Sequence, residues 1–295
     1  MYDKCIICNS NKWGVFRDSK RLITCNNCSL VKLRKFIIKQ DYYRNIKKYK
    51  DILIDNKIDA RRRNVLDRYK LINNIIKNNN KVLDIGCNEG LFLTLLKSNN
   101  IDCIGIEPNK YAYKFAIKNE INVINDYFEN VKFNHKFNVI TAFHVIEHVN
   151  NPVDFVSQIN SLLNTDGYLI IETPNINCYR SKKKKDYWEM IKDEHLYYFS
   201  SKTLFNLLEN NGFIVEKLNL RDFDALYQGM RNQLAKIGIK FYKKIQTKDK
   251  SYDNIETKDH NNINHFKLMR LILYYIIKLF KREDYIFVIA RKINA

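Results

Sequence analysis

A glycine-containing loop and an acidic residue stand at the spacing of a site for a nucleotide-like ligand. Residues 84–90 (Asp-Ile-Gly-Cys-Asn-Glu-Gly) follow a short apolar run and precede a stretch with helical periodicity. At such a junction Gly86 and Gly90 let the backbone approach a ligand, and the start of the helix supplies unpaired N–H groups. Glu107 follows the next apolar run, about 20 residues after the loop, where a carboxylate can accept hydrogen bonds from both hydroxyls of a ribose.

Asp126 and Tyr127 extend this pattern to a third apolar run. They follow Asn122–Ile124, so they are expected at the same edge of a parallel sheet as the loop and Glu107. There a carboxylate can accept a hydrogen bond from an adenine amino group, and an aromatic ring can stack on the base. The loop, Glu107 and the Asp126-Tyr127 pair, each after a successive apolar run, together predict a site for an adenine nucleoside.

Three histidines stand near predicted strand ends, where general acid–base chemistry would need them. His144 and His148 flank the end of a fourth apolar run, and His195 precedes a helix that Ser200 or Ser201 is expected to cap. Imidazole exchanges protons readily near neutral pH. At the start of a helix, His148 is as well suited to a capping or supporting role as to catalysis. His195 can alternatively pack over the bound ligand.

Four cysteines near the N-terminus have the spacing of metal ligands. Two residues separate Cys5 from Cys8 and Cys25 from Cys28, and sixteen residues lie between the two pairs. Thiolates in two such pairs can surround one zinc ion tetrahedrally, which leaves no open position for catalysis. The spacing therefore predicts a structural Zn²⁺ in a zinc-ribbon module over residues 1–40.

Elements that can position these residues are predicted from residue 81 onward, where short apolar runs alternate with amphipathic stretches, as in a mostly parallel α/β sheet. The predicted strands are Val82–Ile85, Cys103–Ile106, Asn122–Ile124, Phe137–Ala142, Tyr168–Glu172, Phe213–Leu220 and Tyr285–Ala290. The predicted helices are Leu91–Ser98, Lys110–Lys118, Val153–Leu163 and Ser201–Asn210. Residues 41–80 are predicted as a connecting helix, and residues 222–283 as a helical insertion before the last strand of a domain spanning 81–295.

The chain resembles the class I methyltransferases of the ubiquinone-biosynthesis and glycan-modifying type over residues 81–221 and the last strand. The resemblance is carried by the loop at 84–90, Glu107, Asp126-Tyr127 and residues 143–149 (Phe-His-Val-Ile-Glu-His-Val). It implies a Rossmann-like seven-stranded α/β sheet and S-adenosyl-L-methionine as the methyl donor.

The resemblance also implies how the cofactor is held: the loop would bind its methionine part, Glu107 its ribose hydroxyls and Asp126 its adenine. The implied cofactor-binding residues are Asp84, Gly86, Cys87, Gly90, Glu107, Asp126, Tyr127 and Phe143. The family's usual third loop residue is glycine, and Asn88 stands here. Because asparagine tolerates a positive φ better than other non-glycine residues, we expect the turn to be preserved.

A second resemblance concerns the run Glu194-His195-Leu196. It is similar to a run in deoxysugar C-methyltransferases, which likewise carry an N-terminal cysteine-rich zinc module. This resemblance implies that His195 acts as the catalytic base and that Glu194 orients or assists it. His144, at the exit of the fourth strand, is the third candidate catalytic residue.

The charge distribution narrows the choice of acceptor. Formal net charge is +19, but residues 1–80 hold 20 Lys and Arg against 7 Asp and Glu, whereas residues 81–221 hold 16 against 17. The predicted catalytic stretch is thus almost neutral, and no Asn-Pro-Pro-Tyr-type base-flipping motif follows the fourth strand. We therefore predict methylation of a sugar, nucleotide sugar or other small glycan precursor or metabolite. The alternative is an RNA methyltransferase whose zinc ribbon and basic flanks bind RNA.

The cellular location is expected to be cytoplasmic. No apolar run follows Met1, and cysteines in metal-ligand spacing fit a reducing compartment. Residues 266–282 are apolar with basic ends. Such a helix can lie on an anionic membrane surface, pack against the protein core, or join two copies of the chain in a homodimer.

Overall fold

The computed structural model describes residues 4–35, 44, 58–221 and 283–293. Most of the connecting segment before residue 58 lies outside these residues, as do nearly all of the predicted insertion and the whole of segment 266–282. None of the described helices is long and apolar enough to span a membrane.

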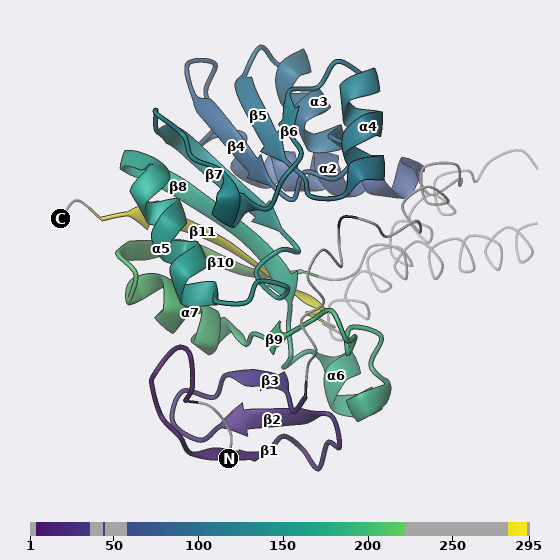
Figure 1. The fold of residues 1–295 in the computed structure, drawn as a ribbon, viewed down its shortest axis with the longest axis vertical. Coiled ribbons are helices and arrows are strands. Elements are labelled where there is room, and N and C mark those ends of the chain that lie inside the picture. The colour runs from purple at the N-terminus through teal and green to yellow at the C-terminus, as the bar shows by residue number, and fades with distance from the viewer. Residues whose placement is uncertain (1–3, 36–43, 45–57, 222–282, 294–295) are drawn as a thin grey trace, which may run out of the picture. The chain divides into compact units, whose positions relative to one another are not determined.

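A seven-stranded sheet organises the described part of the chain, in the order β10-β11-β8-β7-β4-β5-β6 (Figure 1). Its strands are β4 (Lys81–Ile85), β5 (Asp102–Ile106), β6 (Val123–Ile124), β7 (Phe137–Phe143), β8 (Leu163–Pro174), β10 (Phe213–Arg221) and β11 (Tyr285–Lys292). Neighbouring strands pair in parallel in the part of the sheet that holds β8, β7, β4, β5 and β6. The strand β11 runs antiparallel to both β8 and β10. All seven predicted strands are confirmed, and β8 extends past its predicted bounds at both ends.

Helices cover both faces of this sheet (Figure 1). They are α2 (Ile58–Ile72), α3 (Leu91–Ser98), α4 (Lys110–Lys118), α5 (Pro152–Leu162) and α7 (Ser201–Glu209). Successive strand residues point to opposite faces, so Val139 packs with α2, α3 and α4 while Ile140 packs with α5 and α7. Shorter helical segments are η2 (Phe128–Asn130), α6 (Tyr179–Lys184) and η3 (Lys185–Tyr187).

Local capping signals set several helix boundaries. The side chains of Asn109 and Asn151 accept hydrogen bonds from N–H groups in the first turns of α4 and α5. Pro152 occupies the start of α5, where a missing N–H group has no consequence. Ser200 accepts from the Thr203 N–H and is the cap of α7, one of the two caps predicted.

The N-terminal cysteine module contributes three strands to a second, four-stranded sheet, whose order is β1-β2-β3-β9. β1 (Trp13–Val15), β2 (Leu22–Cys25) and β3 (Val31–Leu33) are antiparallel neighbours within the predicted module. The fourth strand, β9 (Tyr197–Tyr198), directly follows the segment that carries His195, and it pairs antiparallel with β3. The prediction of an appended module missed β9, because a strand of two residues has no periodicity to detect.

Candidate active site

The carboxyl ends of β4, β5 and β7 form the edge at which a ligand of this kind of sheet binds. β5 and then β6 follow β4 on one side of it, whereas β7 and then β8 lie on its other side. The direction in which successive strands are added therefore reverses beside β4. Ligands of open parallel sheets bind outside the carboxyl ends of the strands at such a reversal. The predicted cofactor-binding residues lie at or after the carboxyl ends of β4, β5, β6 and β7, and Glu194 and His195 precede β9.

The loop between β4 and α3 has the left-handed turns that its sequence predicts. Gly86, Asn88 and Gly90 have φ angles of 69°, 55° and 78°. A Cβ atom on Gly86 would stand 2.7 Å from Val145 Cγ2, so close packing as well as the backbone angle requires glycine there. Asn88 adopts the conformation expected of the family's third glycine, and the turn is preserved.

Glu107 closes this loop from the end of β5. It is 5% exposed, and its two oxygens accept hydrogen bonds from the backbone N–H groups of Asn88 at 2.9 Å and Asn109 at 2.8 Å. Burial raises the pKa of Glu107 to about 7, against the lowering effect of the two N–H groups. Each oxygen keeps a second lone pair, so the carboxylate can accept from two neighbouring hydroxyls while the backbone holds it in place.

Asp84 is a second buried acid beside the loop. Thr141 Oγ1 donates a hydrogen bond of 2.6 Å to its Oδ1, and burial raises the pKa of Asp84 to about 7. Cys87 is buried in another way: its thiol packs against Gly105, where a Cβ atom would stand 2.4 Å from Sγ. Because burial also raises the pKa of the Cys87 thiol, this residue offers a ligand its backbone rather than a thiolate.

Asp126 and Tyr127 lie together after β6, and Arg44 contacts both. Arg44 donates to Asp126 Oδ1 at 2.6 Å, and its guanidinium lies 5.3 Å from the centroid of the Tyr127 ring. Hydrogen bonds from Asn130 and from the Tyr127 N–H lower the pKa of Asp126. The carboxylate is therefore an ionised acceptor at neutral pH. No sequence pattern singled out Arg44.

A buried ion cluster around Glu172 occupies the neighbouring part of this edge. Glu172 is 3% exposed, and Arg68 NH2 and Nε lie 2.6 and 3.2 Å from its Oε1. Arg221 donates to Oε2, and His144 Nε2 lies 3.0 Å from Oε1. Burial alone would raise the pKa of Glu172, but these neighbours together hold it well below its ordinary value. The predicted cofactor residue Phe143 borders the cluster, with its ring centroid 4.5 Å from the Arg68 guanidinium.

His144 joins this cluster to a further buried acid, Glu147. Its ring nitrogens lie 3.0 Å from Glu172 Oε1 and 3.4 Å from Glu147 Oε1, and its φ is 58°. Burial lowers the pKa of His144, and the two carboxylates more than reverse this, so the pKa is raised. A left-handed backbone at a non-glycine residue indicates that the surroundings hold it there. Both ring nitrogens of His144 thus face buried carboxylates, and protonation of the ring would stabilise those carboxylates.

His195 is buried beside Glu147 and His148. It is 4% exposed, and its ring centroid lies 4.6 Å from that of His148 in an edge-to-face arrangement. One oxygen of Glu147 and one ring nitrogen of each histidine lie within 4.8 Å of one another, so these atoms can pass a proton or hold a divalent cation. Within the described residues, His195 Nδ1 is buried without a hydrogen-bond partner. Burial lowers the pKa of His195 to about 3, so the ring is neutral at neutral pH.

Glu194, predicted to orient His195, contributes its backbone to this arrangement. Its carbonyl oxygen accepts a hydrogen bond of 2.8 Å from His148 Nδ1. Glu147, which the sequence pattern did not mark as a site residue, also contributes a carboxylate that is grouped with the rings of His148 and His195.

Besides Arg44, four charged residues of the site were not predicted, namely Arg68, Glu147, Glu172 and Arg221. Two of them carry a signal in the sequence: Glu147 stands in the 143–149 run, and Glu172 ends a strand of buried apolar residues, where an acid needs a partner. Arg68 and Arg221 carry none, because only the fold brings α2 and the end of β10 to Glu172.

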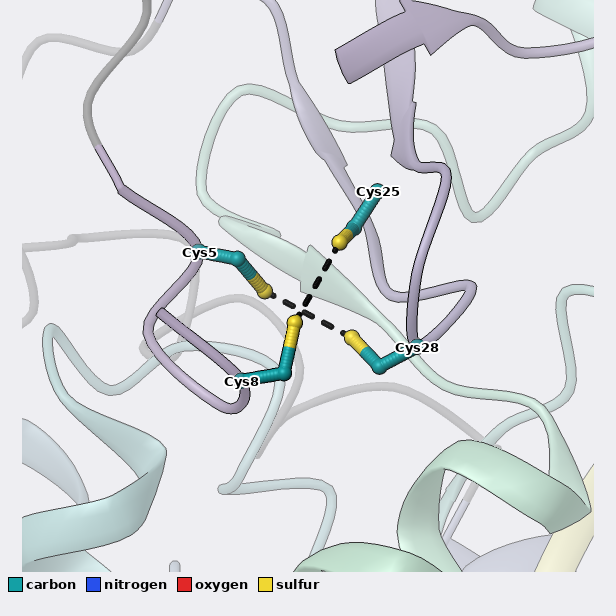
Figure 2. Close-up of side chains that lie close together, drawn as sticks. All are labelled: Cys5, Cys8, Cys25 and Cys28. Atoms are coloured by element: carbon teal, nitrogen blue, oxygen red, sulfur yellow. Dashed lines mark hydrogen bonds between the residues drawn. The ribbon is translucent and has the colours of Figure 1, made fainter. Parts of the chain in front are cut away.

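The four N-terminal cysteines converge on one point (Figure 2). The Sγ atoms of Cys5 and Cys28 are 3.5 Å apart, as are those of Cys8 and Cys25, and all four lie within 4.8 Å of one another. A tetrahedral zinc ion with Zn–S bonds of about 2.3 Å separates its sulfur ligands by about 3.8 Å. The donor set and its spacing therefore fit zinc.

A cavity of about 470 Å³ opens at the opposite edge of the large sheet, beside the beginnings of β7 and β8. Its lining includes Leu71, Asn138, Asp166, Tyr168 and Glu216. None of the predicted site residues lines it, so its size alone does not make it the active site.

The sheet order, the left-handed loop and the carboxylate after the second strand define the class I methyltransferase fold. Residues 58–218, more than half of the chain, match the family described as Methyltransferase domain, and the chain belongs to this family.

Individual relatives match shorter stretches. The ubiquinone biosynthesis O-methyltransferase of Actinobacillus pleuropneumoniae serotype 5b is 33% identical over 107 residues, which cover 32% of this chain and 46% of that protein. The tRNA U34 carboxymethyltransferase of Campylobacter lari is 31% identical over 100 residues, which cover 31% of this chain and 34% of that protein. The chain thus spans less than half the length of these relatives. A SAM-dependent methyltransferase structure from Archaeoglobus fulgidus shares the fold, with a TM-score of 0.53 and 23% identity over 82% of this chain and 99% of that one.

Replacing Arg68 by methionine should destabilise the fold, because Glu172 would keep its buried charge with one guanidinium partner removed. We expect the free energy of unfolding in urea at pH 7 to fall by about 3 kcal/mol. The matched control is the double variant Arg68→Met/Glu172→Gln, which removes the charge as well and should recover most of the loss. Equal destabilisation of the single and double variants would contradict this assignment.

The same measurement has a predictable pH dependence. The pKa of Glu172 is held below its ordinary value of 4.5, so its ionisation stabilises the folded state fully above pH 4.5, and the stabilisation is lost as the pH falls. In Arg68→Met this acid-sensitive part of the stability should be smaller than in the wild type.

Proposed function

We propose that this protein transfers the methyl group of S-adenosyl-L-methionine to a sugar, a nucleotide sugar or another small glycan precursor or metabolite. The observation that carries the proposal is the left-handed loop with Glu107 beside it, held by the N–H groups of Asn88 and Asn109. Membership of the methyltransferase domain family supports the type of reaction. The matched relatives are named for different acceptors, so the choice of acceptor for this protein rests on its own residues.

In the proposed complex the loop backbone holds the methionine part of the cofactor, and Glu107 accepts hydrogen bonds from the ribose hydroxyls. Asp126 accepts one from the adenine amino group, and the Tyr127 ring packs on the base. Both acids suit these roles, because Glu107 keeps unused lone pairs and Asp126 is ionised. When bound, the cofactor supplies an electrophilic methyl group on its sulfonium.

His195 is proposed as the base that takes a proton from the acceptor. Its ring is neutral, so a ring nitrogen can accept. Burial makes it a weak base, and the carboxylate of Glu147 offsets this by favouring the imidazolium that forms. Glu194 then assists through its carbonyl oxygen, which accepts the hydrogen bond from His148 Nδ1.

The contacts of basic side chains favour a small acceptor over RNA. Arg17 and Arg21 of the cysteine module donate to the segment that precedes β9. Lys32 lies 4.6 Å from the centroid of the Trp13 ring, and Lys184 pairs with Glu189. These groups are engaged within the chain and do not form a row of unpaired cations. The RNA alternative draws its support from the basic charge of residues 1–80 and from the tRNA-modifying relative.

We also infer that Cys5, Cys8, Cys25 and Cys28 hold a structural Zn²⁺. Four thiolates complete the coordination of the ion and leave no position for a substrate. A module of this size has little apolar core of its own, so a bound metal would supply much of its folding free energy.

Affinity for S-adenosyl-L-methionine should rise with pH. The pKa of Glu107 is about 7, whereas its contacts with two hydroxyl donors need the ionised carboxylate. In calorimetric titrations the affinity should increase about tenfold between pH 6 and pH 8, which is the change in ionised fraction for such a group. Glu107→Gln should bind at least about tenfold more weakly at pH 8 and lose most of this pH dependence.

Asp84→Asn is the matched control, because the pKa of Asp84 is also about 7. A pH dependence that persists in Glu107→Gln and disappears in Asp84→Asn would contradict the assignment of the ribose site.

A rise in pH has the opposite effect on the stability of the fold. Because the folded-state pKa of Glu107 lies above its ordinary 4.5, the protein without ligand should lose stability as the pH rises from 4.5 to about 7.

Incubation with methyl-labelled S-adenosyl-L-methionine and an extract of the source cells should place label in sugars, nucleotide sugars or lipid-linked glycans. His195→Gln should bind the cofactor as tightly as the wild type but transfer label at least about 100-fold more slowly. His135→Gln, a change at an exposed histidine, is the control and should behave as the wild type. Nuclease-sensitive label in RNA would favour the RNA alternative, and wild-type turnover in His195→Gln would assign His195 to packing.

A further inference from the structure

We propose that the cysteine module is the positioning element for His195: its metal-bound turn fixes β3, and β3 holds the segment carrying His195 at the edge of the large sheet. The inference rests on the proposed roles of His195 and of zinc. It adds to them a connection between the metal and the catalytic base, two parts of the chain far apart in sequence.

The connection passes through Leu196, the residue after His195. The Leu196 carbonyl oxygen accepts a hydrogen bond of 3.2 Å from the Leu33 N–H of β3. The Leu196 N–H donates to the Glu147 carbonyl oxygen at 2.8 Å, and the Tyr197 N–H donates to the same oxygen at 3.2 Å. The start of β9 is thus bonded to the module on one side and to the residue that faces His195 on the other.

Two arginines of the module hold the rest of the segment between β8 and β9. Arg17 donates to the Ile176 carbonyl oxygen at 3.1 Å, near the beginning of this segment. Arg21 donates to the Ile191 carbonyl oxygen at 3.1 Å and to Asp193 Oδ1 at 2.6 Å, just before His195. Bonds from a folded module to both ends of a segment restrict its conformations, which is how a side chain is positioned for catalysis.

Apolar packing joins the same parts. Cys5, Cys25 and Leu30 of the module belong to one hydrophobic cluster with Leu196 and Tyr197. The buried cysteines and the β9 segment therefore share a core, and disorder in one would expose apolar surface of the other.

The metal-binding turn leads directly into β3. Cys25 ends β2, and its N–H and carbonyl groups bond to the Leu30 carbonyl at 2.8 Å and the Ser29 N–H at 2.9 Å. Cys28 lies inside this turn, so a metal held by both cysteines fixes the direction in which the chain enters β3. Without the metal the thiolates lose their common partner, and β3 loses its support.

The first test compares hydrogen–deuterium exchange in the zinc-loaded full chain with exchange after removal of zinc by a chelator. The amides of residues 195–198 should exchange at least about tenfold faster without zinc, whereas those of β4, β5 and the loop at 84–90 should keep their rates. Unchanged exchange at 195–198 would overturn the proposal. Faster exchange throughout the large sheet would also overturn it, because the module would then support the whole fold.

The second test leaves the cysteines intact. Arg21→Met removes the bonds to Ile191 and Asp193, and Lys20→Met is the matched control, because Lys20 bonds to Asp186 through its backbone N–H. With zinc retained, Arg21→Met should speed exchange at 195–198 and lower kcat for methyl transfer several-fold. The KM for S-adenosyl-L-methionine should stay the same, and Arg21→Lys should restore part of the loss. Identical behaviour of Arg21→Met and Lys20→Met would overturn the proposal.

A spectroscopic readout completes the design. In protein labelled with ¹⁵N at histidine, the His195 ring should stay neutral from pH 5 to pH 8 with zinc bound and titrate near its ordinary pKa once zinc is removed. A ring that titrates alike in both states would overturn the proposal. If the wild type binds no S-adenosyl-L-methionine, the proposed function fails, while the exchange and titration results still decide whether the module holds this segment.

Discussion

The acidic groups buried at the carboxyl edge of the large sheet impose the constraint on which the rest of the structure depends. A carboxylate withdrawn from water is strongly destabilising unless hydrogen bonds or cations compensate it. Glu107 is compensated by two backbone N–H groups, Asp84 by a hydroxyl, and Glu172 by two guanidinium groups and an imidazole. Each set of compensating contacts requires a particular arrangement of the backbone. The left-handed turn at Asn88 points its N–H at Glu107, and the fold brings α2 and the end of β10 to Glu172.

The acids fall into two groups that serve different purposes. Asp84 and Glu107 stand beside the loop with raised pKa values, so they are incompletely compensated and gain from a ligand that donates hydrogen bonds. Glu172 and Glu147 have lowered pKa values, the latter about 2: burial alone would raise both, but the arginines and His144 around Glu172 and the histidines around Glu147 more than reverse this. Glu147 lies beside His195, whose ring itself stays neutral. In the proposed function the first pair of acids binds the cofactor, and the second pair lies in the part of the edge that carries the proposed base. The cysteine module contacts this second part through the pairing of β3 with β9.

How far the sequence predicts this arrangement depends on whether a residue acts locally or through distant partners. The strands, the loop and the turn at Asn88 were predictable, because apolar periodicity and the backbone preferences of glycine and asparagine act within a few residues. The cysteine spacing likewise predicted the convergence of four thiols. The partners of Glu172 and the pairing of β9 with β3 were not predictable, because nothing near Arg68 or Tyr197 encodes a contact with a strand more than a hundred residues away. The grouping of the Glu147 carboxylate with the rings of His148 and His195 was likewise not predictable, because nearly fifty residues separate Glu147 from His195 in the sequence.

The most direct test of the proposed site is a crystal structure of the zinc-loaded full chain grown with S-adenosyl-L-homocysteine. Both ribose hydroxyls are expected within hydrogen-bond distance of Glu107, with the adenine against Tyr127 and the sulfur facing the space that His195 borders. A ligand in the cavity at the opposite edge of the sheet, or a ribose with no contact to Glu107, would contradict the proposed site.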